Sequence, residues 1–182
     1  DDPDTARQIA TQQAARGADI IFAAAGASGM GVIDFVNETR CYRPNGPTRT
    51  TPLTEAVAQA PKDPAYAAAC GAGTQPLFFI GVDSNQNYMG DTDGDPATMN
   101  HGLTSMLKRV DVAAYNAVYD VARGTFTPGL QVLGVAEDGV GYAIDAYNEG
   151  LLPESVRNEL QAVRDTIASG QVVVPDYREQ NP

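Results

Sequence analysis

Two apolar runs of strand length, each followed at once by a turn, constrain the fold of this chain more than any other feature. Residues 20–25 and 77–82 are continuous apolar segments. Such runs are typical of strands buried on both faces, as in parallel sheets. The glycine-rich segment 26–31 follows the first run, and residues 32–36 begin a helix. The order strand, glycine turn, helix predicts an α/β fold with a parallel sheet covered on both faces.

Apolar residues at helical spacing predict three more helices. The first is capped by Asp4 or Thr5, because short polar side chains at this position accept a backbone N–H. A glycine follows each helix, where a left-handed residue commonly ends a helix. The predicted helices cover residues 4–16, 107–124 and 153–168. Short strands are predicted at 131–135 and 172–174.

Residues 39–76 interrupt the alternation of strands and helices. The segment is rich in proline, contains short helical stretches at 53–60 and 64–69, and draws most of its apolar content from alanine. This composition indicates an insertion on the α/β scaffold, because a separate domain needs larger apolar side chains for its core. Cys41 and Cys70 both lie in it. From the sequence alone they are either a disulfide closing a long loop or two unrelated thiols.

Charge and hydropathy exclude several classes of function. The 182 residues include 12 basic and 23 acidic ones, for a net charge of −11. An acidic surface repels phosphate backbones and anionic lipids, so we expect no nucleic-acid partner. The longest apolar run, 20–25, is too short to cross a bilayer. No charged segment followed by an apolar one opens the chain, so we expect a signal peptide to be absent or removed.

The glycine turn and the aspartate after the second apolar run are candidate ligand groups. Glycines allow a ligand to approach the backbone, and the following helix offers free N–H groups. The spacing within 26–31 is not that of a dinucleotide-binding turn, and no acidic residue ends a strand about 20 residues on. The alternatives are a small-ligand site and a purely structural turn. Asp83 can accept two hydroxyls of a sugar diol, or it can simply cap a turn.

Other polar groups suggest metal or catalytic sites that the rest of the sequence does not support. The acidic segment 83–95 is rich in oxygen ligands, but Tyr88 and Gly94 occupy positions where a calcium-binding EF-hand loop needs glycine and glutamate. His101 is the only histidine, which argues against a zinc site or a histidine-based triad. Lys108 is expected near a helix N-terminus, where a cation is slightly unfavourable, so it is either a ligand donor or an ordinary surface lysine. We predict no metal and no cofactor.

Five sequence motifs occur here in the order in which the PnrA-like proteins of the basic membrane protein family carry them. Together they resemble that family over nearly the whole chain, except residues 39–76, which form a longer segment than the family's usual linker. The motifs are Gly17-Ala-Asp-Ile-Ile-Phe22, Gly26-Ala-Ser-Gly-Met-Gly31, Ile80-Gly-Val-Asp-Ser-Asn-Gln86, Leu103-Thr-Ser-Met-Leu-Lys-Arg-Val-Asp-Val-Ala113 and Glu137-Asp-Gly-Val-Gly141.

The resemblance implies a type I periplasmic binding protein, in which two doubly wound α/β lobes close on a purine nucleoside for an ABC importer. In that family the aspartate and the lysine hold ribose hydroxyls, the glycine turn lines the sugar side, and an aromatic residue stacks on the purine. No catalysis is implied. The implied ligand residues are Asp83, Lys108, Gly26, Ser28, Gly29 and Phe22.

The resemblance covers only the C-terminal part of such a receptor. It implies that residues 1–106 and 125–182 form most of the C-terminal lobe and that the helix 107–124 belongs to an N-terminal lobe missing from this chain. The expected partners are a nucleoside-like molecule, the ABC permease and that missing lobe. The family is extracytoplasmic and lipid-anchored outside this stretch. An oxidising compartment favours the disulfide between Cys41 and Cys70.

Two other classes of function stay open at this point. One is an enzyme, either a nucleotide-cofactor oxidoreductase or a nucleoside hydrolase, although the glycine spacing and the single histidine argue against it. The other is a surface lipoprotein that senses a ligand instead of delivering it. The same cleft would serve sensing and import, so the sequence does not separate them.

Overall fold

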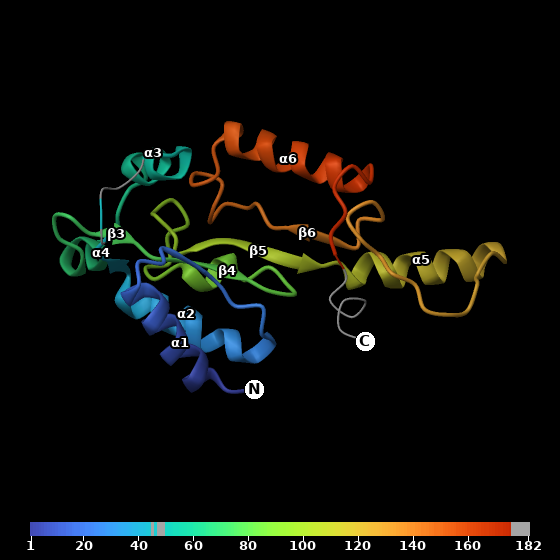
Figure 1. The fold of residues 1–182 in the computed structure, drawn as a ribbon, viewed down its shortest axis with the longest axis horizontal. Coiled ribbons are helices and arrows are strands. Elements are labelled where there is room, and N and C mark those ends of the chain that lie inside the picture. The colour runs from blue at the N-terminus through green and yellow to red at the C-terminus, as the bar shows by residue number, and fades with distance from the viewer. Residues whose placement is uncertain (45, 47–49, 176–182) are drawn as a thin grey trace. The chain divides into compact units, whose positions relative to one another are not determined.

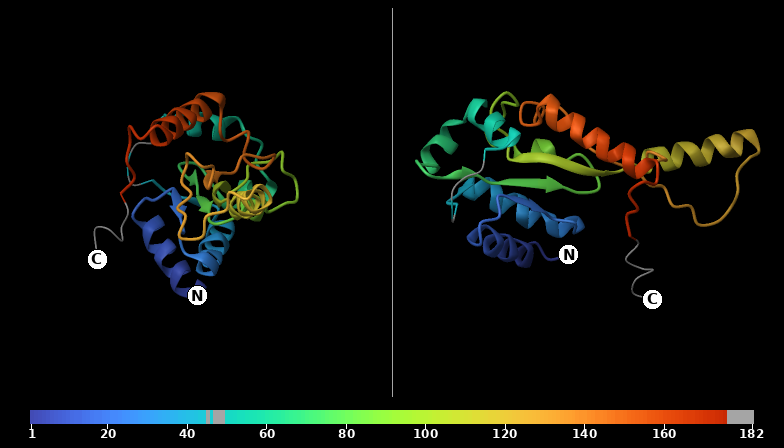
Figure 2. Two further views of the ribbon diagram at one scale, coloured as in Figure 1. Left: turned by 90° about the vertical axis from the view of Figure 1, so that its right-hand side faces the viewer. Right: turned by 45° about the horizontal axis from the view of Figure 1, so that its top comes forward.

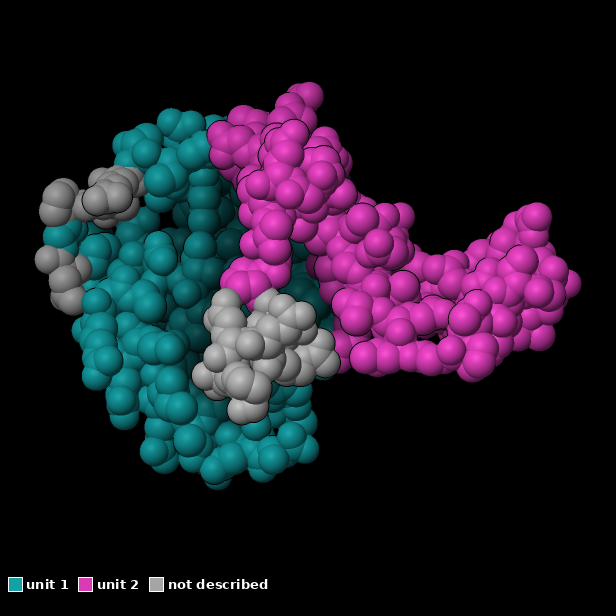
Figure 3. Space-filling model, turned by 45° about the vertical axis from the view of Figure 1, so that its right-hand side comes forward, with its two compact units in different colours: residues 1–107, 142–153 teal, residues 108–141, 154–182 magenta. Residues whose placement is uncertain are grey.

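The computed structural model describes residues 1–44, 46 and 50–175. The chain divides into two compact units, which Figure 3 shows in different colours. The first unit contains residues 1–107 and 142–153, and the second contains residues 108–141 and 154–182. Each unit is described by itself.

The first unit opens with helix α1, Pro3–Ala15, which begins one residue earlier than the sequence predicts. The predicted caps Asp4 and Thr5 are wrong. Asp2 is the N-cap, and its Oδ1 accepts the backbone N–H of Thr5 at 3.0 Å. A proline at the first helical position needs no hydrogen-bond acceptor for its nitrogen, so Pro3 starts the helix.

The glycine turn forms one short 3₁₀ segment and the start of a helix. Strand β1, Ile20–Phe22, is shorter than the predicted 20–25. The 3₁₀ turn η1, Gly26–Ser28, leads into helix α2, Gly29–Thr39. A Cβ atom on Gly31 would lie 1.8 Å from the Pro3 carbonyl oxygen. The last glycine of the motif is therefore required by the packing of α2 against α1 and not by a ligand. Figure 2 shows these two helices side by side.

The central sheet has four strands in the order β1-β4-β5-β6 (Figure 1). β1 pairs with β4 in parallel, and β4 pairs with β5 in parallel. The hydrogen bonds from Ala143 N to Ser105 O and from Arg109 N to Gly139 O run in the antiparallel sense, so β6 is an antiparallel edge. The predicted α/β class is confirmed, and the sheet is mixed. Its later strands are β4 Phe78–Gly81, β5 Gly102–Lys108 and β6 Val140–Tyr142.

The apolar core of the first unit lies between α1, α2 and the strands β1 and β4. Its side chains are almost fully buried, and each contributes about 1.5–3 kcal/mol if it is a large aliphatic or aromatic group. The cluster contains Ala10, Ile21, Val32, Ile33, Phe35, Val36, Leu77 and Phe79.

The insertion is held together by a disulfide and a small sheet. Its helices α3, Pro52–Gln59, and α4, Pro64–Ala69, confirm the two short helices predicted there. The disulfide Cys41–Cys70 is present, with an S–S distance of 2.13 Å, so the bridge implied by the resemblance is confirmed. No sequence pattern predicts the antiparallel pair formed by β2, Cys41–Tyr42, and β3, Gln75–Pro76.

The second unit contains helix α5, Val110–Arg123, and helix α6, Glu154–Ala168, which confirms the predicted helix after Pro153. Asp138 forms an ion pair with Arg164 of α6. The predicted strands at 131–135 and 172–174 are wrong, since neither segment has strand structure. In the part of the chain that the structure describes, no helix is both long and apolar enough to cross a membrane.

The predicted position of Lys108 at the start of a helix is also wrong. Lys108 is the last residue of strand β5, and α5 begins two residues later at Val110. The apolar side chain of Leu107 continues the spacing of the helix stripe backwards, which concealed the strand. The weak argument from an unfavourable cation at a helix N-terminus therefore does not apply to Lys108.

Candidate functional site

Three of the predicted ligand residues follow the carboxyl ends of neighbouring parallel strands. Phe22 is the last residue of β1, Lys108 is the last residue of β5, and Asp83 comes two residues after β4. The register aligns Phe22 with Ile80 of β4. Open α/β sheets bind ligands outside the carboxyl ends of their strands. Within the first unit, the topology therefore places Phe22 and Asp83 at the kind of edge where such proteins hold ligands.

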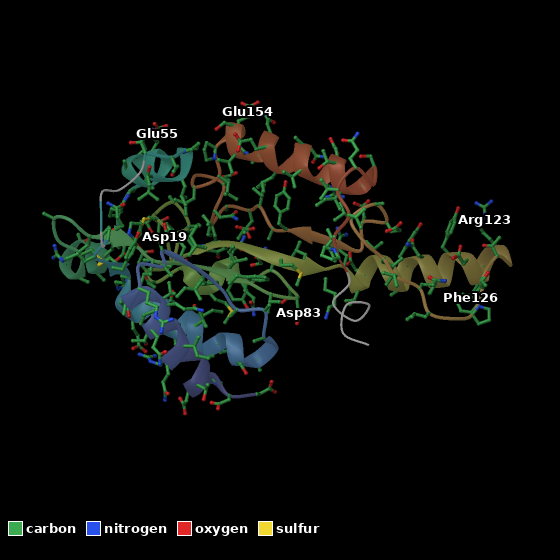
Figure 4. All side chains as sticks on the ribbon, viewed as in Figure 1. Asp19, Glu55, Asp83, Arg123, Phe126 and Glu154 are labelled. Atoms are coloured by element: carbon green, nitrogen blue, oxygen red, sulfur yellow. A yellow bond between two sulfur atoms is a disulfide. The ribbon has the colours of Figure 1, made fainter. Side chains whose placement is uncertain are left out.

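Asp83 has an uncommon backbone conformation. Its φ angle is +67°, in the left-handed region, and its side chain is exposed. Aspartate tolerates this region better than most non-glycine residues, but at a cost. Backbone strain of this kind persists only where the surroundings enforce it, and it is concentrated at functional sites. Figure 4 shows Asp83 at the end of the sheet opposite Asp19, which precedes β1.

The residues around Asp83 explain its sequence motif. The Oε1 atom of Gln86 accepts the backbone N–H of Val82 at 2.9 Å, and the backbone N–H of Gln86 donates to Ser105 Oγ at 2.9 Å. A Cβ atom on Gly81 would lie 2.7 Å from that Ser105 oxygen and 2.8 Å from Gln86 Oε1. The glycine therefore leaves room for the two side chains that close the loop on either side of Asp83.

The glycine turn positions Ser28 and Gly26 differently from each other. Ser28 Oγ accepts the backbone N–H of Asp2 at 2.8 Å, so this hydroxyl ties the start of α1 to the turn and still has a proton to donate. Gly26 is exposed, with φ +42°, and nothing lies within 4 Å of the position of a Cβ atom. Gly29 is buried at the start of α2. The turn thus has an open face at Gly26, while Ser28 is partly engaged in the fold.

Phe22 is 49% exposed although it ends a strand of the sheet. An aromatic ring that is half accessible at a strand end can stack on a flat ligand. In the first unit, Phe22 and Asp83 come from adjacent strands, β1 and β4, and follow them at the same edge. Ring and carboxylate are thus supplied by neighbouring elements.

A cavity of about 410 Å³ lies at the other end of the same strands. Asp19, before β1, and the residues of β3, before β4, contribute to it. Burial raises the pKa of the Tyr42 hydroxyl, and the negative charge of Asp19 raises it further. None of the predicted ligand residues lines this cavity, whose walls comprise Arg16, Gly17, Asp19, Tyr42, Pro44, Gly46, Thr51, Leu53, Thr54, Val57, Gln75, Pro76 and Phe78.

The acidic loop at residues 91–95 satisfies its carboxylates with its own backbone. Asp91 Oδ1 accepts the N–H of Gly94 at 2.8 Å, and Asp95 Oδ1 accepts the N–H of Ala97 at 2.9 Å. The backbone N–H of Asp95 also lowers the pKa of the Asp93 carboxyl. Among the described residues, no group of three or more acidic, histidine or cysteine side chains is arranged to hold a metal ion.

A profile of the family described as "ABC transporter substrate-binding protein PnrA-like" matches residues 1–177. The match covers almost the whole chain, including the insertion. The chain belongs to this family. The resemblance stated from the five motifs is therefore confirmed.

Curated relatives of this PnrA-like chain include two listerial proteins. The "CD4+ T-cell-stimulating antigen" of Listeria monocytogenes serovar 1/2a is 29% identical over 175 residues, which cover 95% of this chain and 40% of that protein. The protein of the same description from Listeria innocua serovar 6a is also 29% identical, with the same coverage. The chain thus spans about 40% of the length of the relatives that it matches.

Solved structures show the same fold. A solute-binding protein of an ABC transporter system from Aeropyrum pernix K1 matches with a TM-score of 0.59 and 22% identity, covering 98% of this chain and 46% of that one. A transcriptional activator of the comK gene from Bacillus halodurans matches with a TM-score of 0.60 and 13% identity, covering 95% and 44%. At these identities the likeness establishes the fold alone.

Sequence reasoning missed the buried polar residues that support the Asp83 loop. Asn87 and Ser105 are fully buried, and Ser105 Oγ donates to Asn87 Oδ1 at 2.7 Å. The sequence of the segment after Asp83 favours a solvated polar loop, because it does not fit the EF-hand template. The signal that was available is the cluster of amide side chains directly after a strand, since amides that are buried must pair with each other or with the backbone.

Proposed function

We propose that this PnrA-like chain is the ligand-holding part of the substrate-binding component of an ABC importer, and that its ligand is a purine nucleoside. The observation that carries the proposal is Asp83. It is an exposed carboxylate in a left-handed conformation, on a loop fixed by Gln86 and Ser105 at the carboxyl edge of the sheet. A carboxylate can accept both hydroxyl hydrogens of a ribose diol. Family membership supports the same role.

The remaining ligand contacts are proposed from the family resemblance. Lys108 donates to a ribose hydroxyl, the backbone of Gly26 and Gly29 and the hydroxyl of Ser28 line the sugar side, and Phe22 stacks on the base. The half-exposed ring of Phe22 and the open surface at Gly26 support these roles. The protein delivers its ligand from the extracytoplasmic side to a permease and catalyses no reaction.

The rest of the receptor supplies the second wall of the ligand cleft in this proposal. Helix α5 has no buried residue, and its exposed side chains include Tyr115 at 67% and Val118 at 71%. Apolar patches of this kind normally have a partner. Because the chain spans only about 40% of its curated relatives, we assign the covering partner to the remaining lobe of the same receptor. Isolated 1–182 should then bind nucleosides weakly or not at all, and nanomolar binding by it would contradict this assignment.

The proposed ligand contact is tested with the complete receptor by titration calorimetry. Adenosine, guanosine and inosine are compared with their 2′,3′-dideoxy analogues. Wild-type receptor should bind the nucleosides at least about tenfold more tightly than the analogues, because a hydrogen bond to a charged group contributes about 1.5–3 kcal/mol. Asp83→Ala should lose affinity for the nucleosides by a similar factor and distinguish the two sets much less than the wild type does.

Asp19→Ala is the matched control, since Asp19 is an exposed aspartate at the opposite end of the same strands. It should leave both sets of affinities unchanged. Chromatography of the nucleoside recovered from each titration should show no free base. If Asp83→Ala discriminated between the two sets as well as the wild type does, Asp83 would not be a ligand residue. Release of free base would show that the protein is a hydrolase and not a receptor.

A further inference from the structure

The strained backbone of Asp83 needs an anchor on its C-terminal side. On the N-terminal side the loop is tied to β4 through Val82, whose N–H donates to Gln86 and whose carbonyl accepts the N–H of Ser84 at 2.8 Å. A left-handed aspartate is retained only where its neighbours are fixed. The residues that fix the following segment therefore decide how the Asp83 carboxylate is presented.

Besides Ser105, which contacts Gln86 and Asn87, a carboxylate from a distant part of the chain holds the segment after Asp83. Asp145 Oδ2 accepts the side-chain amide of Asn85 at 2.7 Å and that of Asn87 at 3.2 Å. Asn85 and Asn87 are also joined to each other, because the backbone N–H of Asn87 donates to Asn85 Oδ1 at 3.0 Å. Oδ2 of Asp145 thus accepts hydrogen bonds from two side-chain amides, one on each side of Gln86 in the sequence.

Asp145 is itself fixed on a rigid support. Its backbone N–H donates to Asn148 Oδ1 at 2.8 Å, and its second carboxylate oxygen accepts the N–H of Tyr147 at 2.9 Å. The fully buried Asn148 donates to the carbonyls of Leu103 and Ala143, both at 2.9 Å. The Asp145 carboxylate therefore has a defined position relative to β5. Through its hydrogen bonds to Asn85 and Asn87 it can fix the loop after Asp83 relative to the same strand.

We infer that Asp145 is a positioning residue for the ligand site: by holding Asn85 and Asn87 it keeps Asp83 in the conformation that binds the ligand. This inference rests on the proposed function of Asp83 but concerns a residue outside the proposed ligand contacts. The chemistry favours a carboxylate at this position. Two amide N–H groups converge on one oxygen, and a charged acceptor makes stronger bonds with both of them than a neutral one.

The isosteric change Asp145→Asn tests the inference in the complete receptor. An asparagine has one acceptor oxygen, so its own amide must face either the two amides of Asn85 and Asn87 or the N–H of Tyr147. We expect about tenfold weaker binding of adenosine by calorimetry, together with faster amide hydrogen exchange in residues 84–87. Asp34→Asn, on the exposed face of α2, is the matched control and should change neither quantity.

The double variant Asn85→Asp/Asp145→Asn reverses the donor and acceptor of the bond between these two residues. It should recover most of the affinity and protection that Asp145→Asn loses, whereas Asn85→Asp alone, with two facing carboxylates, should be impaired. Recovery of both quantities would show that the bond between positions 85 and 145 carries the effect.

The outcomes separate this inference from the function on which it rests. If the wild-type receptor shows no affinity for nucleosides, the proposed function is wrong. The hydrogen-exchange measurement then still decides whether Asp145 holds the loop. Unchanged exchange in residues 84–87 of Asp145→Asn overturns the inference. So does faster exchange with unaltered affinity in a receptor that binds adenosine, because the loop would then not govern the presentation of Asp83.

Discussion

Asp63 Oδ2 lies 3.4 Å from Nη1 of Arg40, and this ion pair joins the insertion to the end of α2. The side chain of Asp63 is 2% exposed and that of Arg40 is 16% exposed. Asp63 also caps α4 by accepting the N–H of Tyr66 at 2.8 Å, and Arg40 donates to Thr92 at 2.8 Å. The buried pair thus ties α2, the insertion and the acidic loop together.

The variant Asp63→Ala should be strongly destabilised. Removing one partner of a buried pair leaves an uncompensated charge, which costs about 3–5 kcal/mol. The control is Glu38→Ala, which removes the partner of Arg7 in an exposed ion pair and should cost less than about 1 kcal/mol. Urea unfolding followed by circular dichroism measures both changes. Equal small shifts in the two variants would show that the Arg40–Asp63 pair does not hold the insertion.

Opening the disulfide should loosen the insertion without removing the sheet. Cys41 and Cys70 are 29 positions apart, and closing a loop of this length stabilises the folded state by about 3–4 kcal/mol on the chain-entropy model. The double variant Cys41→Ser/Cys70→Ser should show that loss in urea. Wild-type protein in reducing buffer should behave like the variant, while the variant itself should not respond to reductant. A wild-type midpoint that reductant leaves unchanged would contradict the expectation.

The elements whose pattern is local could be predicted from the sequence. The helices at 153–168 and in the insertion, and the two apolar runs that contain β1 and β4, are marked by turn residues and by their own periodicity. The antiparallel β2–β3 pair could not be predicted, because two residues per strand carry no period and the pairing depends on distant partners. Strand β5 was missed because it runs into α5 with a break of one residue, and its apolar residues fit the helical spacing equally well.

The candidate site shows the same division. Asp83 and Lys108 are predicted from motifs, and each lies at or just after the end of a strand, where ligands bind in open sheets. Asp145 was not found, because its role depends on contacts with Asn85 and Asn87, about 60 residues earlier in the chain. Polar residues that pair over such separations resemble solvated loop residues when only the sequence is considered.

His101 should make the stability of the first unit depend on pH. Its ring is fully buried, Nδ1 lies 2.8 Å from the Leu77 carbonyl oxygen, and Nε2 has no hydrogen-bond partner among the described residues. Burial lowers the pKa of His101 below its ordinary value of about 6.5, and the nearby charge of Arg40 lowers it further, against the opposite influences of the Leu77 carbonyl and Asp63. The folded protein therefore resists protonation more than the unfolded chain does.

The sign of the effect follows from proton linkage. Between the folded-state pKa of His101 and about pH 6.5, the unfolded chain binds more protons than the folded protein. The contribution of neutral His101 to the free energy of unfolding is therefore complete above about pH 6.5 and falls as the pH drops through that window. His101→Asn keeps a donor near the Leu77 carbonyl and removes the titration. Urea midpoints measured at about pH 7.5 and about pH 5.5 should differ for the wild type and much less for the variant. Parallel losses in both proteins would assign the effect to other groups.

Substitutions at Asp83 should separate the stability of the fold from the binding of the ligand. At φ +67° a residue with a Cβ atom pays about 1–2 kcal/mol that glycine does not. Asp83→Gly should therefore be at least as stable as the wild type in urea, and Asp83→Ala should be about 1 kcal/mol less stable than Asp83→Gly. Both variants lack the carboxylate and should lose nucleoside affinity in the complete receptor to a similar degree. If Asp83→Gly kept its affinity, the left-handed conformation would serve the turn alone, and the carboxylate would have no part in binding.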